Sequence, residues 1–323
     1  MKCFIAGGTG VLGKRLVALL IDNGHEVGVL SRSKEKSEFI SSLGAIPIEV
    51  NLFDKAKLIE ATSGYEIFIH TATSIPKKSK VQPTDWEMNS KIRIEGTQNL
   101  ISAAQTHKAK LYIQQSIIFH YGHRNGDWVD EDTEITNPYP VYTKPNKSWQ
   151  KVNNITLEME NIVTNAMKHF HLPAVILRCG WFYSHDSSNL SFIADGGMPI
   201  VGGGNAFWNM ITIDDAAQAF YLAVSNYQKV AGATINIVDD EPVKIKDFIT
   251  FATQSNGKHP KKINPYMYKL IKGNQSLNFV MNSVRVKNIK AKSLLEWKPK
   301  YPTYKEGIVH ELSLLMQNKG NLM

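Results

Sequence analysis

Apolar and polar positions along the first 180 residues predict strands and helices in alternation. Apolar stretches predicted as strands cover 2–6, 26–31, 46–50, 66–70, 111–118 and 174–179. Segments predicted as helices lie between them, at 11–24, 34–43, a short one from Asp54, 84–107 and 147–171. The first helix carries its leucines at the i, i+4, i+7, i+8 spacing of one packed face: Leu12, Leu16, Leu19 and Leu20. Short spacing between strands that are apolar throughout predicts a parallel sheet with helices on both faces.

The regular alternation ends after Cys179. Residues 184–209 are rich in glycine, serine and aromatic side chains. A strand at 210–213, a helix from Asp214, a strand at 234–238 and then mostly helical sequence are predicted to follow. We therefore expect an α/β fold, a doubly wound parallel sheet with a smaller, mostly helical C-terminal lobe. The sheet domain is expected over 1–180 and 210–238, and the lobe over 181–209 and 239–323.

Composition places the chain among ordinary globular proteins. Its 323 residues are 43% hydrophobic and 20% charged, which excludes disordered, collagen-like and disulfide-scaffold chains. Uninterrupted apolar runs stay below ~18 residues, so no membrane span is expected, and a strand at the very start predicts that no signal peptide precedes the fold. Cys3 and Cys179 lie in apolar strands. We expect both to be buried thiols in a reducing compartment, which predicts a cytoplasmic protein; a disulfide between them is the alternative.

The net charge of +8 is concentrated near the C-terminus. Between Lys258 and Lys305 there are twelve lysines and arginines against one acid, Glu296, a local charge of +11, so the remainder carries −3. A lysine-rich solvated exterior is the simplest interpretation, and an anionic ligand or acidic partner is the alternative. The block carries no nucleic-acid-binding signature, so we do not expect nucleic acid as a partner.

The loop after the first predicted strand carries the strongest chemical signal. Residues 7–13 read Gly-Gly-Thr-Gly-Val-Leu-Gly and lead directly into the first predicted helix. Gly7 permits a tight turn, Gly10 lets a pyrophosphate approach the backbone, and Gly13 allows close contact between helix and strand. The helix N-terminus adds unpaired N–H groups that attract phosphates. The sequence therefore predicts a dinucleotide site with contacts from Gly7, Thr9, Gly10, Val11, Leu12 and Gly13.

The end of the second predicted strand indicates which dinucleotide is bound. An NAD site places an acid there to bind the ribose 2′-hydroxyl, whereas this strand ends Ser31-Arg32-Ser33-Lys34. The Arg32 guanidinium and the Ser33 hydroxyl are suited to a 2′-phosphate. The sequence thus favours NADP(H) over NAD. In the alternative interpretation, Arg32 caps the strand edge and stacks on the adenine.

Further motifs extend along the chain: His70-Thr71-Ala72, Asn89, residues 95–100, Ser116, Tyr121-Gly122, residues 177–183, Asp214-Asp215-Ala216, residues 238–242 and residues 295–299. With the glycine spacing, this pattern resembles the extended short-chain dehydrogenase/reductase family, the NAD-dependent epimerase/dehydratase group. The resemblance implies a Rossmann sheet, with Asn51 and Leu52 flanking the adenine and Ala72 and Thr73 along the cofactor. It also implies that the turn after Cys179 faces the nicotinamide, and it suggests a homodimer through helices 84–107 and 147–171.

The proton-transfer pair of that family is missing. Its members carry Tyr-x-x-x-Lys at the start of the helix after strand five, where the lysine lowers the pKa of the tyrosine. Here Tyr139 would need a lysine at Thr143, and Tyr142 would need one at Asn146; counting back from Glu160 puts Val152 and Thr156 in the two places. Two literal matches, Tyr268/Lys272 and Tyr301/Lys305, lie far along the chain, where we expect surface roles.

Ser116 and Tyr121 are the remaining catalytic candidates. Ser116 ends a strand, where α/β sheets bind ligands, so it could polarise a carbonyl and contact the cofactor; a structural serine is the alternative. Tyr121 could act as a substitute acid, or it could pack in a turn. His120 is expected to be structural. Tyr142, together with Lys144 or Lys147, is a further candidate near the expected reaction centre. His169 and His171 are two apart and do not share a helix face, so no metal site is expected.

The predicted lobe departs from the sugar-nucleotide members of the family. Trp181 and Trp208 stand where those members place an asparagine and an arginine. Together with Phe182 they predict an apolar, aromatic-lined substrate pocket, unless these rings form the core of the lobe. We therefore expect an atypical NADP(H)-binding oxidoreductase that transfers hydride on a small apolar carbonyl or alcohol. A non-catalytic dinucleotide sensor or scaffold, and a nucleotide-sugar epimerase or dehydratase, are the alternatives.

Overall fold

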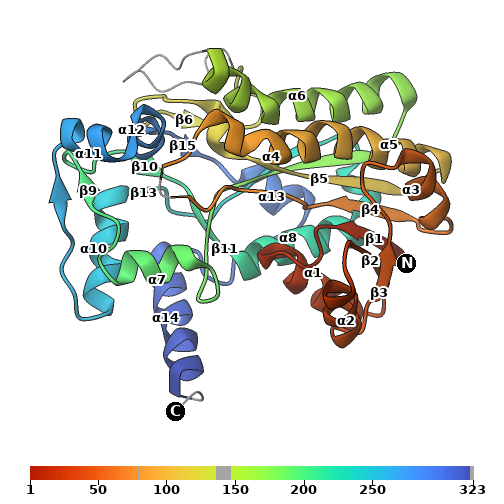
Figure 1. Cartoon of the computed structure of the whole chain (residues 1–323), viewed down its shortest axis with the longest axis horizontal. Coiled ribbons are helices and arrows are strands. Elements are labelled where there is room, and N and C mark those ends of the chain that lie inside the picture. Colours follow the sequence, from red (N-terminus) through yellow and green to blue (C-terminus); the bar gives the residue numbers. More distant parts are fainter. Residues whose placement is uncertain (79, 136–146, 321–323) are drawn as a thin grey trace.

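A seven-stranded parallel sheet forms the centre of the computed structural model, which describes residues 1–78, 80–135 and 147–320 (Figure 1). Its strand order is β12-β7-β5-β4-β1-β2-β3. The strands are β1 (Lys2–Ala6), β2 (Glu26–Ser31), β3 (Ile46–Glu49), β4 (Ile67–His70), β5 (Leu111–Ile117), β7 (Ala174–Cys179) and β12 (Thr234–Ile237). Every pairing in this sheet is parallel. The expected doubly wound α/β fold is confirmed, and chain order reverses between β1 and β4, where such sheets bind ligands.

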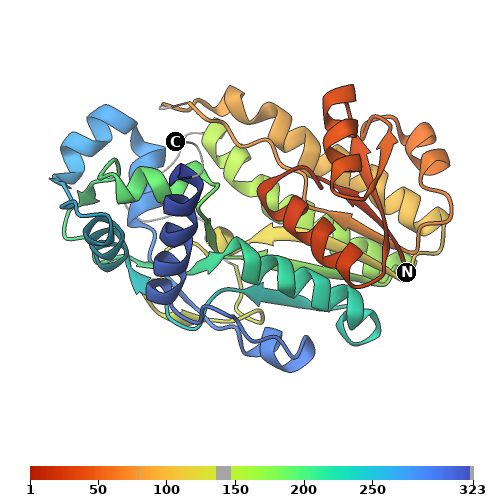
Figure 2. The ribbon, with the colours of Figure 1, turned by 90° about the horizontal axis from the view of Figure 1, so that it is seen from below.

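Helices cover both faces of the sheet (Figure 2). One face packs against α1 (Val11–Asp22), α2 (Lys34–Ser42) and α8 (Ile213–Ser225), with Leu16, Ile40 and Phe220 in its core. The other packs against α3 (Lys55–Ala61), α5 (Thr97–Thr106) and α6 (Lys147–Phe170), with Leu58, Leu100 and Val163 in its core. Strand residues alternate between the two cores, as Ile5 and Phe4 do on β1.

The segment predicted as one helix over 84–107 is divided into several parts. It begins as a 3₁₀ turn, Pro83–Trp86, continues as α4 (Glu87–Lys91), widens into a π-helical turn at Ile92–Gly96 and ends as α5. A Cβ atom at Gly96 would lie 2.8 Å from Leu52 Cδ2 and 3.4 Å from His70 Nε2. The π turn therefore sits where the helix backbone comes close to the sheet, near the reversal point.

A second group of elements forms the lobe on the left of Figure 1. Its helices are α7 (Ser188–Ala194), α10 (Ile245–Ser255), α11 (Pro265–Lys272), α12 (Asn274–Met281) and α14 (Tyr304–Gly320), while α9 (Tyr227–Val230) and α13 (Ile289–Leu294) lie against the sheet domain. Short strands connect them: β6 (Trp128–Val129), β8 (Trp181–Tyr183), β9 (Ile200–Val201), β10 (Phe207–Trp208), β11 (Met210–Thr212), β13 (Val243–Lys244), β14 (Lys262–Ile263) and β15 (Arg285–Val286). The strand expected at 210–213 pairs with β8 outside the main sheet, whereas the strand expected at 234–238 forms the sheet edge. The division into two domains stays a prediction.

Both cysteines are free and buried, as expected. Burial raises the pKa of the Cys3 thiol to about 12 and raises that of Cys179 as well. Within the described ranges, no helix has both the length and the apolar character needed to cross a membrane.

Candidate functional site

The glycine loop follows β1 at the carboxyl edge of the sheet. Gly7 has φ +102°, a conformation that favours glycine, and a Cβ there would lie 2.5 Å from Ala72 N. A Cβ at Gly13 would lie 2.1 Å from Gly7 O and 2.6 Å from Gly8 Cα. Neither position can hold a larger residue, because Gly7 packs against the backbone of the segment after β4 and Gly13 packs against the loop itself. The spacing of the glycines is thus required by contacts in three dimensions.

Helix α1 begins with its first N–H groups free. Gly10 caps the helix without a side-chain hydrogen bond, and its N–H donates to Gly7 O over 3.0 Å. The first helical hydrogen bond comes from Lys14 N to Gly10 O, and no acid occupies the first turn. The N–H groups of Val11, Leu12 and Gly13 therefore point out of the helix end, where they fit a pyrophosphate.

Strand β2 ends beside an exposed cation. Arg32 is exposed, and the described residues give its guanidinium no ion-pair or hydrogen-bond partner. The Ser33 hydroxyl accepts from Lys36 N and caps α2. Glu49, which pairs with Ser31 across β2 and β3, accepts a hydrogen bond from Ser37 Oγ at 2.7 Å. The surroundings of Arg32 are therefore suited to an additional negative charge.

The residues expected around the adenine and the nicotinamide line the same edge. Asn51 is exposed, and its Oδ1 accepts from Phe53 N at 3.0 Å, which fixes the turn after β3. Leu52 is buried, and its carbonyl accepts from Asn99 Nδ2 at 3.0 Å. Ala72 is partly buried and Thr73 is exposed in the segment after β4. These positions fit a dinucleotide lying across the sheet end, and their contact with one stays a prediction.

A buried network joins the ends of β5 and β7 to α6. Glu160 accepts from Arg178 Nη2 at 2.8 Å and from Arg178 Nε at 3.1 and 3.2 Å. Arg178 Nη1 also donates to the Tyr121 hydroxyl at 2.7 Å, and that hydroxyl donates to Asn236 Oδ1 at 3.0 Å. Burial raises the pKa of Glu160, but His120, Arg178 and Ser116 outweigh it, so the pKa lies below its ordinary value.

Ser116 and Tyr121, the predicted catalytic residues, both belong to this network. The Ser116 hydroxyl donates to Glu160 Oε1, and neither Ser116 nor Tyr121 is exposed to solvent. Burial raises the pKa of Tyr121 to about 12. His120 is also buried; its Nε2 lies 3.5 Å from Glu160 Oε1, and burial lowers its pKa to about 4. Because each hydroxyl has one proton and already donates it inside the chain, donation to a substrate oxygen would require one of these bonds to break.

The positions where the sequence predicts that the proton-transfer pair is missing are described only in part. Tyr139, Tyr142, Thr143, Lys144 and Asn146 lie outside the described residues, while Lys147 is exposed at the start of α6. The positions counted back from Glu160 hold a half-buried Val152 and a buried Thr156 on α6. Neither side chain titrates.

The two literal Tyr-x-x-x-Lys matches belong to the lobe. Tyr268 is partly buried against its core, and Tyr301 stacks on His310 with ring centroids 4.5 Å apart. Both tyrosines thus have packing partners in the lobe. Residues 1–78, 80–135 and 147–320 contain no group of three or more His, Cys, Asp or Glu able to hold a metal ion.

Aromatic rings connect the lobe to the loop after β5. Trp181 and Trp208 meet edge-on with centroids 4.7 Å apart, and Trp208 lies 5.2 Å from Phe279. Phe279 in turn lies 5.0 Å from Phe119. Trp208 is 3% exposed and its Nε1 has no hydrogen-bond partner among the described residues, whereas Trp181 and Phe182 are partly exposed. Trp208 therefore belongs to the lobe core, while Trp181 packs on that core and Phe182 packs on the core of the sheet.

Ion pairs that the sequence does not predict connect α1 to the loop after β8 and to the start of α8. Asp186, after β8, pairs with Lys14 and with Arg15 Nη2, the latter at 3.0 Å, and Asp214 pairs with Arg15 Nε. Burial raises the pKa of Asp186, but the two cations hold it well below its usual range. The pairs hold the loop after β8 against the first turns of α1. No local motif marks them, because 171 residues separate Asp186 from Arg15.

Comparison with known proteins agrees with this geometry. The chain is 24% identical over 321 residues to a 3-diazoavenalumate denitrifying reductase of Streptomyces, covering 96% of this chain and 100% of the relative. It is 23% identical to the decarboxylating sterol-4-alpha-carboxylate 3-dehydrogenase of Dictyostelium discoideum, covering 81% and 78%.

Solved structures share the fold. A human epimerase family protein with NADPH superposes with a TM-score of 0.76 at 18% identity, covering 97% of this chain and 99% of that one. The UDP-glucuronic acid 4-epimerase of Bacillus cereus, in complex with UDP-glucuronic acid and NAD, gives 0.75 at 23% identity, covering 98% and 100%. The model of the NAD dependent epimerase/dehydratase family matches residues 3–237. The chain therefore belongs to the NAD dependent epimerase/dehydratase family and is an NAD(P)-dependent oxidoreductase- or epimerase-like enzyme.

Proposed function

We propose that this enzyme is an NADP(H)-dependent oxidoreductase that transfers hydride on a small, apolar carbonyl or alcohol substrate. The observation that carries the proposal is the unpaired Arg32 guanidinium at the end of β2, next to the capped start of α2. An NAD site would place a carboxylate there. A guanidinium gives a 2′-phosphate two parallel charge-assisted hydrogen bonds, and the Ser33 hydroxyl supplies another contact.

The glycine loop and the start of α1 also fit the pyrophosphate, the central part of the cofactor. The space beside Gly7 and Gly13 admits no Cβ, and the start of α1 offers free N–H groups to the pyrophosphate. When bound, the nicotinamide supplies or accepts the hydride. The chain binds the phosphates, directs the ring toward the turn after Cys179, and excludes water with the lobe that Asp186 holds over α1.

An apolar substrate is supported by the partly exposed rings of Trp181 and Phe182 beside that turn. Exposed aromatic rings offer a ligand a large apolar contact area. One relative, the sterol-4-alpha-carboxylate 3-dehydrogenase, also supports an apolar substrate. For Ser116 and Tyr121 we propose a structural role in place of the direct catalytic role expected from the sequence, because Glu160, Arg178 and Asn236 already bind their hydroxyls.

The proposal is tested by calorimetric titration of NADPH and NADH into the wild type, Arg32→Asp and Lys168→Asp. Losing one charged contact to the 2′-phosphate is worth about 2 kcal/mol, or ~30-fold in Kd. We expect Arg32→Asp to weaken NADPH by that factor and to leave NADH within about threefold. Lys168→Asp, a matched charge reversal at the exposed end of α6, should change neither.

Equal affinity of the wild type for NADPH and NADH would refute the cofactor assignment. Turnover is tested separately by following NADPH oxidation with a panel of apolar ketones, aldehydes and UDP-sugars. Binding without turnover of any apolar carbonyl would favour a non-catalytic sensor, and epimerisation of a UDP-sugar would favour the epimerase alternative.

A further inference from the structure

Helix α11 turns its apolar face toward solvent. Tyr266, Met267, Leu270 and Ile271 are 66%, 49%, 58% and 56% exposed, and the helix contains no buried residue. At ~100° per residue these four positions fall within an arc of about 140°. Tyr268 projects on the other side, where it packs against the core of the lobe. A surface helix of a globular protein normally has the opposite orientation.

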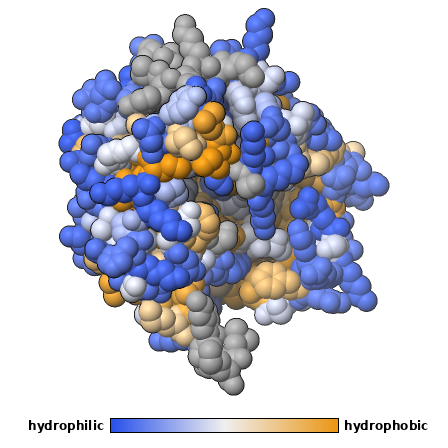
Figure 3. All heavy atoms as spheres, turned by 60° about the vertical axis from the view of Figure 1, so that its left-hand side comes forward, coloured by the Kyte–Doolittle hydropathy of each residue, from blue (hydrophilic) through white to orange (hydrophobic). Residues whose placement is uncertain are grey.

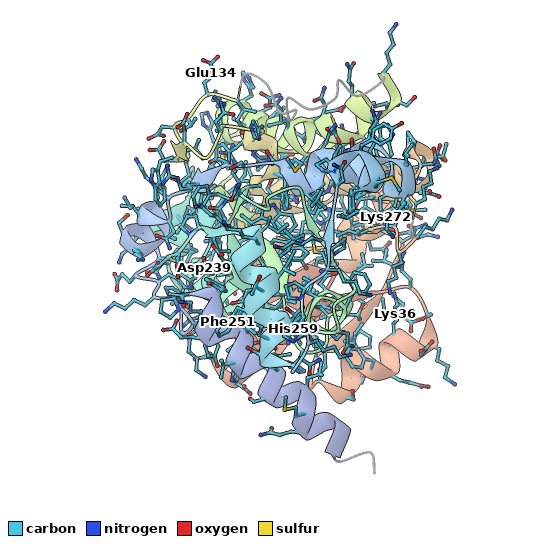
Figure 4. All side chains as sticks on the ribbon, turned by 90° about the vertical axis from the view of Figure 1, so that its left-hand side faces the viewer. Lys36, Glu134, Asp239, Phe251, His259 and Lys272 are labelled. Atoms are coloured by element: carbon cyan, nitrogen blue, oxygen red, sulfur yellow. The ribbon has the colours of Figure 1, made fainter. Side chains whose placement is uncertain are left out.

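The exposed face lies at the end of the lobe farthest from the amino terminus in Figure 1. Figure 3 shows apolar side chains gathered on the lobe side of the molecule with hydrophilic ones around them. In Figure 4, Lys272, the last residue of α11, lies toward the edge of the molecule, whereas the labelled Asp239 is buried. Nothing in the described part of the chain covers the outer arc of α11.

The chain around α11 is rich in lysine and poor in acid. Lys258, Lys261 and Lys262 precede the helix in sequence, Lys269 lies about 60° beyond the edge of the arc, and Lys272 projects on the side of Tyr268. No acid occurs between residues 258 and 295. Two acids reach the region from other elements. Asp195 pairs with Lys258 at 3.3 Å, and Asp247 lines a shallow pocket together with Lys262. The patch therefore combines apolar area with a net positive charge.

We propose that α11 binds an anionic membrane surface, with its apolar arc in the headgroup–acyl boundary and the lysines at the lipid phosphates. A helix with aromatic and aliphatic residues on one side and lysines on its polar side is suited to this interface, and a tyrosine such as Tyr266 has an apolar body with a polar tip that favours the headgroup level. A second copy of the chain is disfavoured, because symmetric contact would bring two lysine-rich faces together. The proposal is independent of the function proposed above.

The test is sedimentation of the full chain with vesicles of phosphatidylcholine, with and without phosphatidylserine. We expect binding to the anionic vesicles only, weakened as salt rises. Each lysine near the surface contributes roughly fivefold in affinity, so Lys269→Gln and Lys272→Gln together should weaken binding about 25-fold. Leu270→Glu/Ile271→Glu should weaken it at least tenfold, because it removes apolar area and adds negative charge.

The matched control is Ile289→Glu/Val309→Glu, which makes the same charge change at apolar side chains 67% and 57% exposed elsewhere. It should bind vesicles as the wild type does. Circular dichroism and NADPH titration confirm that each variant is folded. Absence of wild-type binding to anionic vesicles at low salt would overturn the proposal. Equal losses of vesicle binding in Leu270→Glu/Ile271→Glu and in the control Ile289→Glu/Val309→Glu would also overturn it. So would binding of the wild type to polyglutamate without binding to vesicles, or a dimer in ultracentrifugation that only Leu270→Glu/Ile271→Glu dissociates.

Discussion

Replacing Glu160 with glutamine tests the buried network most directly. Glu160 is the carboxylate that faces two buried guanidinium groups, those of Arg178 and Arg93. Arg93 donates to Met159 Sδ at 3.4 Å, and burial lowers its pKa to about 10. Neutralising the carboxylate leaves both positive charges without compensation in a region closed to water.

Removing one partner from a buried ion pair costs about 3–5 kcal/mol, because the remaining charge stays desolvated. The entropy of unfolding is ~2.1 cal/mol/K per residue, summed here over 323 residues. Dividing the lost free energy of unfolding by this entropy gives a fall in Tm of about 4–7 °C. We expect Glu160→Gln to show that fall in thermal unfolding followed by circular dichroism. Glu158→Gln, an exposed glutamate on the same helix, should stay within about 0.5 kcal/mol of the wild type.

The pH dependence gives a second readout. Because the folded-state pKa of Glu160 lies below its ordinary value, ionised Glu160 stabilises the protein above the unfolded pKa of ~4.3, and this contribution is lost as pH falls through the folded pKa. Glu160→Gln should remove this part of the loss of stability at acid pH. The double variant Glu160→Gln/Arg178→Met should cost less than the sum of the two single variants. Equal stability of Glu160→Gln and Glu158→Gln would refute the reasoning.

Three further predictions concern other buried positions. Ser116→Ala removes one donor from Glu160 and should cost ~1–2 kcal/mol in urea unfolding, while a hundredfold fall in kcat with unchanged stability would show instead that Ser116 contacts the substrate. Asp239 is buried, and burial raises its pKa well above the usual range, so it destabilises the fold as pH rises above ~3.9. Asp239→Asn should therefore raise Tm at neutral pH and flatten its dependence on pH, and a lower Tm at pH 7 would contradict this. Gly13→Ala places a Cβ 2.1 Å from Gly7 O and should cost about 1–3 kcal/mol and weaken NADPH at least tenfold; unchanged calorimetric affinity would contradict it.

The sequence by itself determined the sheet and the glycine loop after β1, and it predicts the departure from the family's proton-transfer pair. These features are local: strand periodicity, the glycines at 7, 10 and 13, and the residues around Tyr139 are each contained in a short segment. The predicted strand bounds agree with the observed ones within one residue for β1, β2, β4, β5 and β7. Local patterns succeed here because backbone conformation and the burial of a strand depend mainly on neighbouring residues.

Only the tertiary structure decided what the polar side chains do. Ser116 meets Glu160 across 44 positions, and Tyr121 meets Asn236 across 115, so no spacing rule relates them. The same applies to α11, because only the packing of the whole chain decides that Tyr266, Leu270 and Ile271 are left exposed. Whether a hydroxyl is free or a helix face is covered depends on packing between distant segments, and that packing is fixed by the whole chain.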